Sequence, residues 1–454
     1  MNLHRLLQQR AAEGRPVRVG VIGCGKFASM YLAQAPTTPG LHVLGIADLA
    51  PARAIGNLKR VGWEPARYGA GSLGEAVDQG TTHLGDDVAA LIGHPAVDVI
   101  VEATGHPPAG VRHALMAIAA RKHVVMVTVE ADAFVGPLLA RKAAEAGVIY
   151  SLAYGDQPAL ICDLVDWARA SGFSVTAAGR GHKWLPKFAQ STPDTVWDNW
   201  GLSAEQAKIG GMNPRMFNSF LDGTKPAIES TAVANATGLT PAPDGLAYPP
   251  CATPELAQVM RPRAEGGMLD HKGQVEVVSS LRPDGSEIAD NLRWGVWVVF
   301  EAPNEYSARC FREYGLATDA SGRYASMYKR WHLIGLELGI SVAAVALRGE
   351  ATGCATGFRA DAVATAKKDM NQGDVLDGEG GYTVSGKLLP AATSLKLGAL
   401  PIGLAHNVTL KRPVKQGAVV TWADVVADED DDVVRFRREM ERAFATEAPR
   451  RAAE

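Results

Sequence analysis

The stretch VGVIGCGKFASM (residues 19–30) constrains the fold more than any other feature of this chain. A run of β-branched residues leads into Gly23 and Gly25, and Ala28 follows at the head of a helix-forming segment. The first glycine permits a tight turn, the second lets the backbone approach a diphosphate, and the small third residue lets helix and strand pack closely. A strand, a glycine turn and a helix in this order predict the first βαβ unit of a dinucleotide-binding sheet.

The alternation of short apolar runs with helical stretches continues to about residue 155. This rhythm is typical of a doubly wound parallel sheet with helices on both faces. We therefore predict an α/β fold with a Rossmann-like domain over residues 1–155. Its expected strands are VRVGVIG, LHVLGIAD, VDVIVEAT, HVVMVTV and GVIYSLA.

Candidate cofactor residues lie at the ends of these strands. The helix that opens with Lys26 and Phe27 would offer free backbone N–H groups to the diphosphate. Asp48 would bond a ribose 2′-hydroxyl, which favours NAD, whereas Arg53 could pair with the 2′-phosphate of NADP if Asp48 rotates aside. The choice between NAD and NADP is open at this point. The residues expected to border the nicotinamide follow a later strand, and they are Ala103, Thr104 and Gly105.

Composition excludes several classes of protein. The 454 residues include 46 Lys and Arg against 49 Asp and Glu, and this balance gives no support for a nucleic-acid or membrane surface. Five scattered cysteines without CxxC pairs argue against a disulfide framework and a zinc knuckle. No run approaches the ~18 apolar residues of a membrane helix, and the N-terminus lacks the apolar core of a signal peptide. We expect a cytoplasmic protein of two or three domains.

The pattern changes after the expected Rossmann-like domain. Residues 156–355 combine Gly- and Pro-rich loops with strands such as QVEVVSSL and GVWVVFEA, which predicts an α+β substrate domain with room for a homodimer interface. We expect one long helix, ASMYKRWHLIGLELGISVAAVAL, to close it. In the predicted β domain over residues 356–430, residues 362–380 and 407–425 repeat at an offset of 44, each as a strand, a Gln-Gly turn and a second strand. Residues 431–454 form a charged C-terminal helix and tail.

The stretch AAGRGHKWLPKF (residues 177–188) crowds four basic residues around one tryptophan. Lys183 or His182 could donate a proton to a substrate oxygen. Arg180 and Lys187 could grip a phosphate or a carboxylate, because a bound anion would relieve their mutual repulsion. The alternative is that the apolar side chains pack while the cations extend to water.

A second group of candidates follows in GTKPAIESTAVANATGL (residues 223–239). Glu229 could serve as a general base or a metal ligand, and Lys225 and Asn235 could contact substrate. Asp156, just past the last predicted strand, could bind a metal ion or a substrate hydroxyl. No segment has a dedicated metal-ligand spacing, so Asp156 and Glu229 are the metal ligands that we consider.

The glycine turn, GRGHKWLPKF, GTKPAIESTAVANATGL and the tail from KLLPAATS to TWADV resemble the 1-deoxy-D-xylulose 5-phosphate reductoisomerase-like (DRL) proteins. These are similar to homoserine dehydrogenases in their N-terminal half and carry a C-terminal SAF domain, a small β-clip module. The resemblance runs from about residue 1 to about residue 430. It implies NADPH as cofactor, whereas Asp48 leaves NAD as the alternative.

The resemblance also implies a reaction, the reductoisomerisation of 1-deoxy-D-xylulose 5-phosphate to 2-C-methyl-D-erythritol 4-phosphate, a step of isoprenoid precursor synthesis. A Mg or Mn ion would stabilise the developing oxyanion, and the cationic stretch would hold the phosphate. Homoserine dehydrogenases carry an Asn-Lys pair where this chain has Val129 and Glu130, which argues against homoserine as substrate. Two alternatives are an NAD(P)-dependent dehydrogenase of a small sugar acid or polyol, and a sensor that binds the dinucleotide without turnover.

Overall fold

The computed structural model describes residues 2–209 and 211–445. The chain divides into two compact units, each built from two separate segments. Unit 1 comprises residues 1–160 and 332–355, and unit 2 comprises residues 161–331 and 356–454. In the described part of the chain, no helix combines the length and the apolar character that a bilayer-spanning segment needs.

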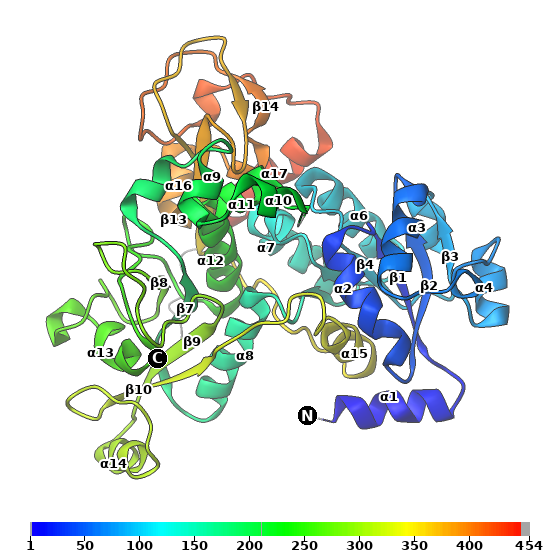
Figure 1. Ribbon diagram of the computed structural model, residues 1–454, viewed down its shortest axis with the longest axis horizontal. Helices are drawn as coiled ribbons and strands as arrows, with labels where there is room; N and C mark the ends of the chain where they lie inside the picture. Colours follow the sequence, from blue (N-terminus) through cyan, green and yellow to red (C-terminus); the bar gives the residue numbers. More distant parts are fainter. Residues whose placement is uncertain (1, 210, 446–454) are drawn as a thin grey trace. The chain divides into compact units, whose positions relative to one another are not determined.

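Unit 1 contains a six-stranded parallel sheet with the strand order β3-β2-β1-β4-β5-β6, which confirms the predicted Rossmann-like fold (Figure 1). Five of its strands are the predicted ones, whereas β3 is a short addition that has too few apolar residues to be recognised. The strands are β1 (Val17–Ile22), β2 (Leu41–Ala47), β3 (His83–Gly85), β4 (Val99–Glu102), β5 (His123–Met126) and β6 (Tyr150–Leu152).

Helices cover both faces of this sheet because successive residues of a strand point to opposite faces. On one face Val19 and Val21 are buried with apolar side chains of α2, α3 and α15. On the other face Gly20 lies against Leu91 of α5. The helices of unit 1 are α1 (Leu3–Ala12), α2 (Lys26–Gln34), α3 (Pro51–Arg60), α4 (Leu73–Gln79), α5 (Val88–Gly93), α6 (Pro107–Ala119), α7 (Val129–Glu145) and α15 (Gly339–Leu347), and α8 (Gln157–Ala170) begins here and continues into unit 2.

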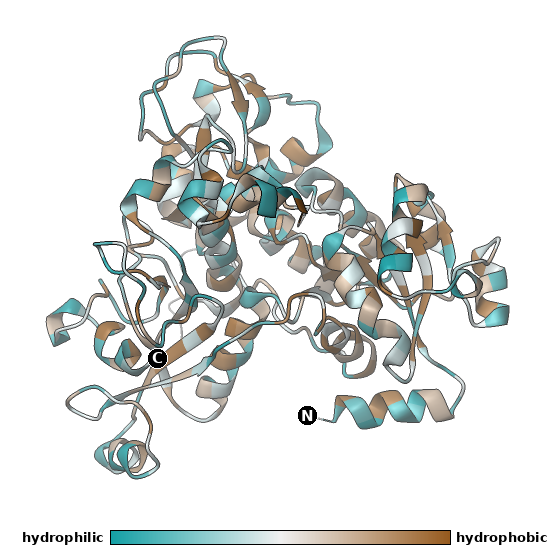
Figure 2. Cartoon of the chain, in the orientation of Figure 1, coloured by the Kyte–Doolittle hydropathy of each residue, from teal (hydrophilic) through white to brown (hydrophobic). Residues whose placement is uncertain are grey.

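The segment 332–355 returns to unit 1 and closes the sheet. Its helix α15 packs against α1, whose Leu3 and Leu7 are buried, and Figure 2 shows both hydrophobic and hydrophilic colours along α1. After α15, the chain runs beside β6, where the Leu152 N–H donates to the Gly353 carbonyl at 2.7 Å. This segment, which we predicted to belong to the second domain, therefore belongs to unit 1.

The long helix predicted over residues 325–347 is wrong. Residues Tyr324–Lys329 form the strand β10, and only Gly339–Leu347 are helical. Gly335, in the segment between them, has φ = +74°, a conformation that interrupts a right-handed helix. The apolar spacing that suggested a single helix therefore comes from a strand, β10, followed by a shorter helix, α15.

Unit 2 contains a four-stranded sheet with the order β10-β9-β7-β8, in which β7 pairs parallel with β8 and antiparallel with β9. Its strands are β7 (Ser174–His182), β8 (Gln274–Ser279), β9 (Val296–Glu301) and β10. Buried residues of β7, β8 and β9 pack with Leu256 and Met260 in one apolar cluster. The helices of this part are α9 (Val196–Trp200), α10 (Ala204–Ile209), α11 (Pro214–Leu221), α12 (Thr224–Thr237), α13 (Leu256–Val259) and α14 (Glu305–Glu313).

The tail belongs to unit 2 and contains two small antiparallel sheets, β11 with β13 and β12 with β14. The hydrogen bonds confirm the predicted internal repeat, although only its first copy contains both predicted strands and its second contains one, His406–Thr409. The Gly373 N–H donates to Leu410 and the Gly417 N–H donates to Ala366, so the two copies exchange equivalent bonds about the mutual Met370–Val414 pair. This is the pattern of a local pseudo-twofold axis. The tail elements are β11 (Ala360–Ala366), β12 (Val375–Asp377), β13 (Val384–Pro390), α16 (Ala391–Leu397), β14 (His406–Thr409) and α17 (Asp432–Ala445).

Helix α17 is more than a solvated charged segment. Asp431 accepts the Val433 N–H at 2.8 Å, so its carboxylate caps the helix. Arg437 is fully buried and forms ion pairs with Asp361 of β11 and Glu441 of its own helix. The charges of α17 therefore tie it to the tail sheet. The part of the predicted C-terminal segment from 446 to 454 lies outside the described residues.

Candidate functional site

The glycine turn between β1 and α2 has the geometry of a diphosphate cradle. Gly23 has φ = +88°, and a Cβ atom there would lie 2.7 Å from the Ala103 carbonyl oxygen, so no other residue fits. Gly25 begins α2, and a Cβ atom there would have no heavy atom within 4 Å. Ala28 is buried against the sheet. The first turn of α2, which includes Lys26 and Phe27, therefore presents its N–H groups beside open space.

Asp48 is held rigidly at the end of β2. One carboxylate oxygen accepts the Cys24 N–H at 2.7 Å, and the other accepts the Ala50 N–H at 2.8 Å. The largely exposed Arg53 guanidinium lies 3.3 Å from the second oxygen. Because two backbone N–H groups hold the carboxylate, Asp48 is not placed to rotate aside for a 2′-phosphate.

Two more carboxylates lie at the neighbouring strand end. The Asp48 N–H donates to the Gly85 carbonyl of β3 at 3.0 Å, and Asp86 and Asp87 follow directly. A small hollow between β2, β3 and α5 is lined by Ala47, Gly85 and both of these aspartates. The ribose side of the candidate site is therefore acidic.

The end of β4 brings together the residues expected to border the nicotinamide. Thr104 donates its hydroxyl to Glu102 at 2.5 Å, and the Gly105 N–H donates to the Thr128 hydroxyl at 3.0 Å. Ala103 pairs with β1 through its N–H. Sequence reasoning missed Glu102, which is fully buried and orients Thr104, because a carboxylate inside a strand of four residues has no recognisable spacing.

In unit 2 the cationic stretch divides into buried and exposed parts. Arg180 of β7 forms an ion pair with Glu229 of α12, and both side chains are almost completely buried. The Arg180 guanidinium also lies 5.9 Å from the ring centroid of Phe220. Its charge is therefore neutralised inside the protein, and the predicted role of Arg180 as an anion clamp is not supported. Glu229, which we predicted as a base or a metal ligand, is engaged in this same ion pair.

His182 is a buried neutral histidine. Its Nε2 lies 2.8 Å from the Phe220 carbonyl oxygen, so this nitrogen carries the proton and donates it. Burial lowers the pKa of His182 well below its usual value, and the neighbouring Arg180 lowers it further. The imidazole therefore holds β7 to the end of α11, and its N–H is not directed at a substrate.

Lys183 caps a short helix. Its ammonium donates to the Asn199 and Trp200 carbonyls at the end of α9, at 2.9 and 2.7 Å. Burial lowers its pKa from the ordinary value for lysine, and Arg293 and Lys187 lower it further. Lys187 is exposed, and its ammonium lies 5.7 Å from the ring centroid of Phe188. Of the four predicted cations, only these two remain available to an anion.

The other predicted residues of α12 take different places. Lys225 is half-buried in the first turn of the helix. Asn235 is fully buried, and its amide group bonds the backbone of Arg359 and Ala360 at 2.7 to 3.3 Å. Asn235 therefore attaches α12 to β11, and a substrate contact is not supported.

The two predicted metal ligands do not lie together within either unit. Asp156 belongs to unit 1 and accepts the Gln157 N–H, whereas Glu229 belongs to unit 2 and is paired with Arg180. Over residues 2–209 and 211–445, no three His, Cys, Asp or Glu side chains are grouped to hold a metal. The predicted Mg or Mn site is therefore not supported.

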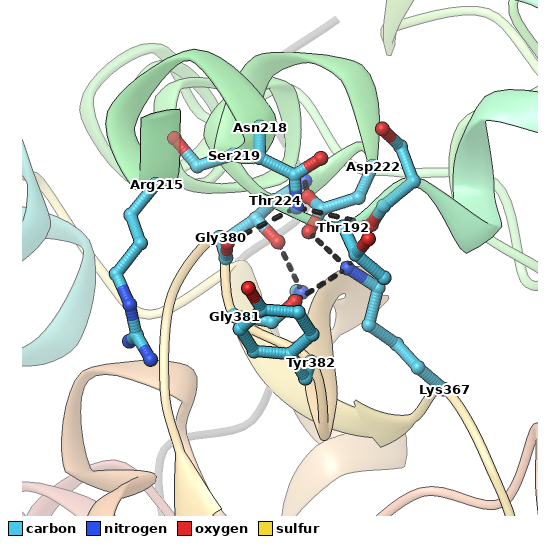
Figure 3. Close-up of polar contacts among 12 residues, drawn as sticks. Thr192, Arg215, Asn218, Ser219, Asp222, Thr224, Lys367, Gly380, Gly381 and Tyr382 are labelled. Atoms are coloured by element: carbon cyan, nitrogen blue, oxygen red, sulfur yellow. Dashed lines mark hydrogen bonds and ion pairs between the residues drawn. The ribbon is translucent and has the colours of Figure 1, made fainter. Parts of the chain in front are cut away.

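Sequence reasoning also missed a buried ion pair between the tail and α11. Figure 3 shows the Lys367 ammonium facing Asp222 and Gly381. It donates to the Asp222 carboxylate at 2.8 Å, the Ser191 carbonyl at 2.6 Å and the Gly381 carbonyl at 2.9 Å. The other Asp222 oxygen accepts the Thr224 N–H at 3.0 Å, at the start of α12. Lys367 lies in the first copy of the repeat, but nothing in the sequence indicated its distant partner.

The six-stranded parallel sheet and the glycine turn define a Rossmann-type dinucleotide-binding fold. Residues 155–338 match the family described as "Oxidoreductase DRL, catalytic domain", and this segment contains the cationic stretch and α12. The match supports an enzyme that contains an oxidoreductase catalytic domain, as predicted. No curated protein matches the chain.

Several solved structures are similar to this chain. Oxidoreductase yvaA of Bacillus subtilis has 14% sequence identity and a TM-score of 0.38, over 74% of this chain and 89% of that chain. A dehydrogenase of Thermotoga maritima has 16% identity and a TM-score of 0.27, over 40% of this chain and 52% of that chain. The myo-inositol dehydrogenase of Lactobacillus casei, solved with NAD(H) and myo-inositol, has 12% identity and a TM-score of 0.28, over 40% of this chain and 50% of that chain. The chain thus spans about half the length of the last two.

Proposed function

We propose that the chain interconverts an alcohol and a carbonyl on a small anionic, sugar-derived substrate, with NAD as its preferred cofactor. The observation that supports this most is the glycine turn, which combines an open Gly25 with the rigid Asp48 carboxylate. Such a carboxylate bonds a ribose 2′-hydroxyl and repels a 2′-phosphate. The acidic pair Asp86 and Asp87 adds to this repulsion, and NADP is the less favoured alternative.

The residues of unit 1 have separate roles in holding the dinucleotide. The N–H groups at the start of α2 would bind the diphosphate, and Asp48 would bind the adenosine ribose. Thr104 and Gly105, fixed by Glu102 and Thr128, would border the nicotinamide. When bound, the dinucleotide supplies or accepts the hydride.

Two substrates deserve direct comparison. The DRL match over residues 155–338 favours 1-deoxy-D-xylulose 5-phosphate, with 2-C-methyl-D-erythritol 4-phosphate as product. Glu229 is ion-paired with Arg180, which favours the second candidate, a dehydrogenase of a small sugar acid or polyol. That reaction needs no carboxylate ligand for a metal. The sensor hypothesis is the least favoured, since the matched segment is a catalytic domain.

The deciding experiment follows the absorbance of NADH and NADPH at one protein concentration with deoxyxylulose phosphate, with and without Mg²⁺ or Mn²⁺. Products are identified by mass spectrometry and NMR. Sugar acids and polyols are then tested in the oxidative direction with NAD. Methylerythritol phosphate as product supports the first substrate, and oxidation of a sugar acid supports the second. Tight cofactor binding without turnover of any substrate would overturn the proposal.

A further inference from the structure

The Arg293 side chain of unit 2 has no hydrogen-bond acceptor among the described residues, and no sequence motif had indicated a role for it. It lies in the turn that precedes β9 and is half-buried. Its guanidinium carbon lies 5.0 Å from the ring centroid of Trp200 and 4.8 Å from that of Trp294. Its Nε is covered without a hydrogen-bond partner, and no carboxylate within the described ranges forms an ion pair with it. Arg180, by contrast, is neutralised by Glu229.

Two lysines of the cationic stretch converge on the same aromatic side chains. The Lys183 ammonium donates to the Trp200 carbonyl at 2.7 Å, so Lys183 and Arg293 both contact Trp200. Lys183 and Lys187 lie 6.0 and 5.7 Å from the ring centroid of Phe188. Each of the three cations therefore contacts Trp200 or Phe188, and Lys183 contacts both.

The scaffold under these cations is well packed. Phe188 is buried in an apolar cluster with Leu185, Val196 and Leu221, and Trp200 packs against that cluster. Gly201 ends α9 in the left-handed conformation, with φ = +84°. The Trp200 carbonyl and ring are thus held in place, and so are the positions of Lys183 and Arg293.

The charges around this scaffold are not balanced. Burial lowers the pKa values of Lys183 and Arg293, and Arg293 lowers that of Lys183 further. The carboxylate that acts on both residues is Glu287, which opposes the shift in each case. A phosphate dianion bound against these cations would relieve their mutual repulsion. A guanidinium also offers paired N–H donors that suit phosphate oxygens.

We propose that Lys183, Lys187 and Arg293 form a binding site for a phosphate monoester, with Arg293 as its main anchor. The identification of this monoester as the phosphate of the substrate rests on the proposed function, whereas anion binding by the site does not. Stacking between Trp200 and Trp294 orients the guanidinium so that it needs little rearrangement to receive the anion. Arg293 thereby takes the role that the sequence had suggested for Arg180.

The test uses inorganic phosphate as the probe and the full-length protein. Because Trp200 and Trp294 flank Arg293, tryptophan fluorescence should change saturably on titration with phosphate, and calorimetry gives the dissociation constant independently. Arg293→Met should raise that constant at least about tenfold, as expected for loss of charge-assisted hydrogen bonds. Arg293→Lys should retain part of the affinity. Acetate should bind more weakly than phosphate, because it carries one charge.

Arg309 provides a matched control. It also stacks on an aromatic ring, with its guanidinium 5.2 Å from the ring centroid of Tyr306, but it is paired with Glu313 of the same helix. Arg309→Met should leave phosphate affinity unchanged. Thermal unfolding of each variant shows whether a loss of binding comes from a loss of fold. The absence of saturable phosphate binding, or equal affinity in wild type and Arg293→Met, would overturn the site.

A separate measurement distinguishes this proposal from the proposed function. NADH binding should be the same in wild type and Arg293→Met, because the glycine turn and Asp48 belong to unit 1. Phosphate binding that depends on Arg293, in a protein that turns over no substrate, would support the site and contradict the proposed function. Turnover of a phosphorylated substrate with a KM unchanged in Arg293→Met would contradict the assignment of the substrate phosphate to this site.

Discussion

Individual residues show how burial decides what an ionisable group can do. Arg180 and Lys183 are three positions apart, yet one is neutralised by Glu229 and the other bonds two carbonyls at a helix end. Asp48 is fixed in orientation at the end of β2 because two backbone N–H groups bond its carboxylate. Side chains with a similar charge in the sequence therefore have different partners, and these depend on how deeply each side chain is buried.

The choice of cofactor should depend on Asp48. Asp48→Asn removes the negative charge while keeping the side-chain size, so NADH affinity should fall and the NADH-to-NADPH affinity ratio should fall by about tenfold or more. Dissociation constants measured by fluorescence titration give that ratio. Asp78→Asn, on the exposed side of α4, is the control. An unchanged ratio in Asp48→Asn would show that other groups select the cofactor.

Asp132 should make stability depend on pH. Burial raises its pKa from an ordinary value of 3.8 to about 7, although Tyr150 donates a hydrogen bond to it. The folded state therefore binds the proton more tightly, and the free energy of unfolding should fall as pH rises from about 4 to about 7, by on the order of 4 kcal/mol at most.

Asp132→Asn should flatten this decline, and urea unfolding at pH 5 and pH 8 measures it. Glu276 contributes a decline of the same sign, since burial raises its pKa to about 7 as well, so the variant removes only part of the effect. An identical pH profile in Asp132→Asn and wild type would contradict the assignment.

At the level of elements, the two glycines of the turn have different roles, one in folding and one in binding. Gly23 has a positive φ and faces the Ala103 carbonyl, whereas Gly25 has φ = −80° and faces open space. The two positions share one motif but carry different constraints. The first glycine is therefore required for the fold of the turn, and the second for the binding of a ligand.

Alanine at the two positions should therefore give different results. Gly23→Ala should lower the melting temperature, because strain at a positive φ adds to the clash with Ala103. Gly25→Ala should melt like wild type yet lose affinity for the dinucleotide, because its methyl group occupies the diphosphate space. Calorimetric melting and NADH titration of both variants check this. Normal NADH affinity in Gly25→Ala would argue against the cradle.

At the level of the whole molecule, both units are assembled from segments distant in sequence. The segment 332–355 completes unit 1, and the tail after residue 355 completes unit 2. Lys367 joins the tail to Asp222 at the start of α12, the helix that carries Glu229. The tail is therefore a structural part of unit 2 and not an appended module.

Lys367→Met should destabilise unit 2 strongly, by about 3 to 5 kcal/mol, because it leaves the buried Asp222 carboxylate without its cation. Denaturant unfolding followed by tryptophan fluorescence measures the loss. The double variant Lys367→Met with Asp222→Asn should recover part of the stability. Lys415→Met, which removes an exposed ion pair with Asp369, should have little effect. Equal stability of the Lys367 variant and wild type would contradict this account.

The sequence by itself determined the Rossmann-like sheet, the diphosphate turn, the position of Asp48 and the internal repeat, because each depends on local spacing that strand and helix geometry impose. Only the tertiary structure decided the partners of Arg180, His182 and Asn235, the role of Arg293, and the return of residues 332–355 to unit 1. These depend on contacts between residues distant in the chain, such as Arg180 with Glu229 and Lys367 with Asp222. Local spacing carries no information about such pairs, since burial and charge balance arise only when separate elements pack together.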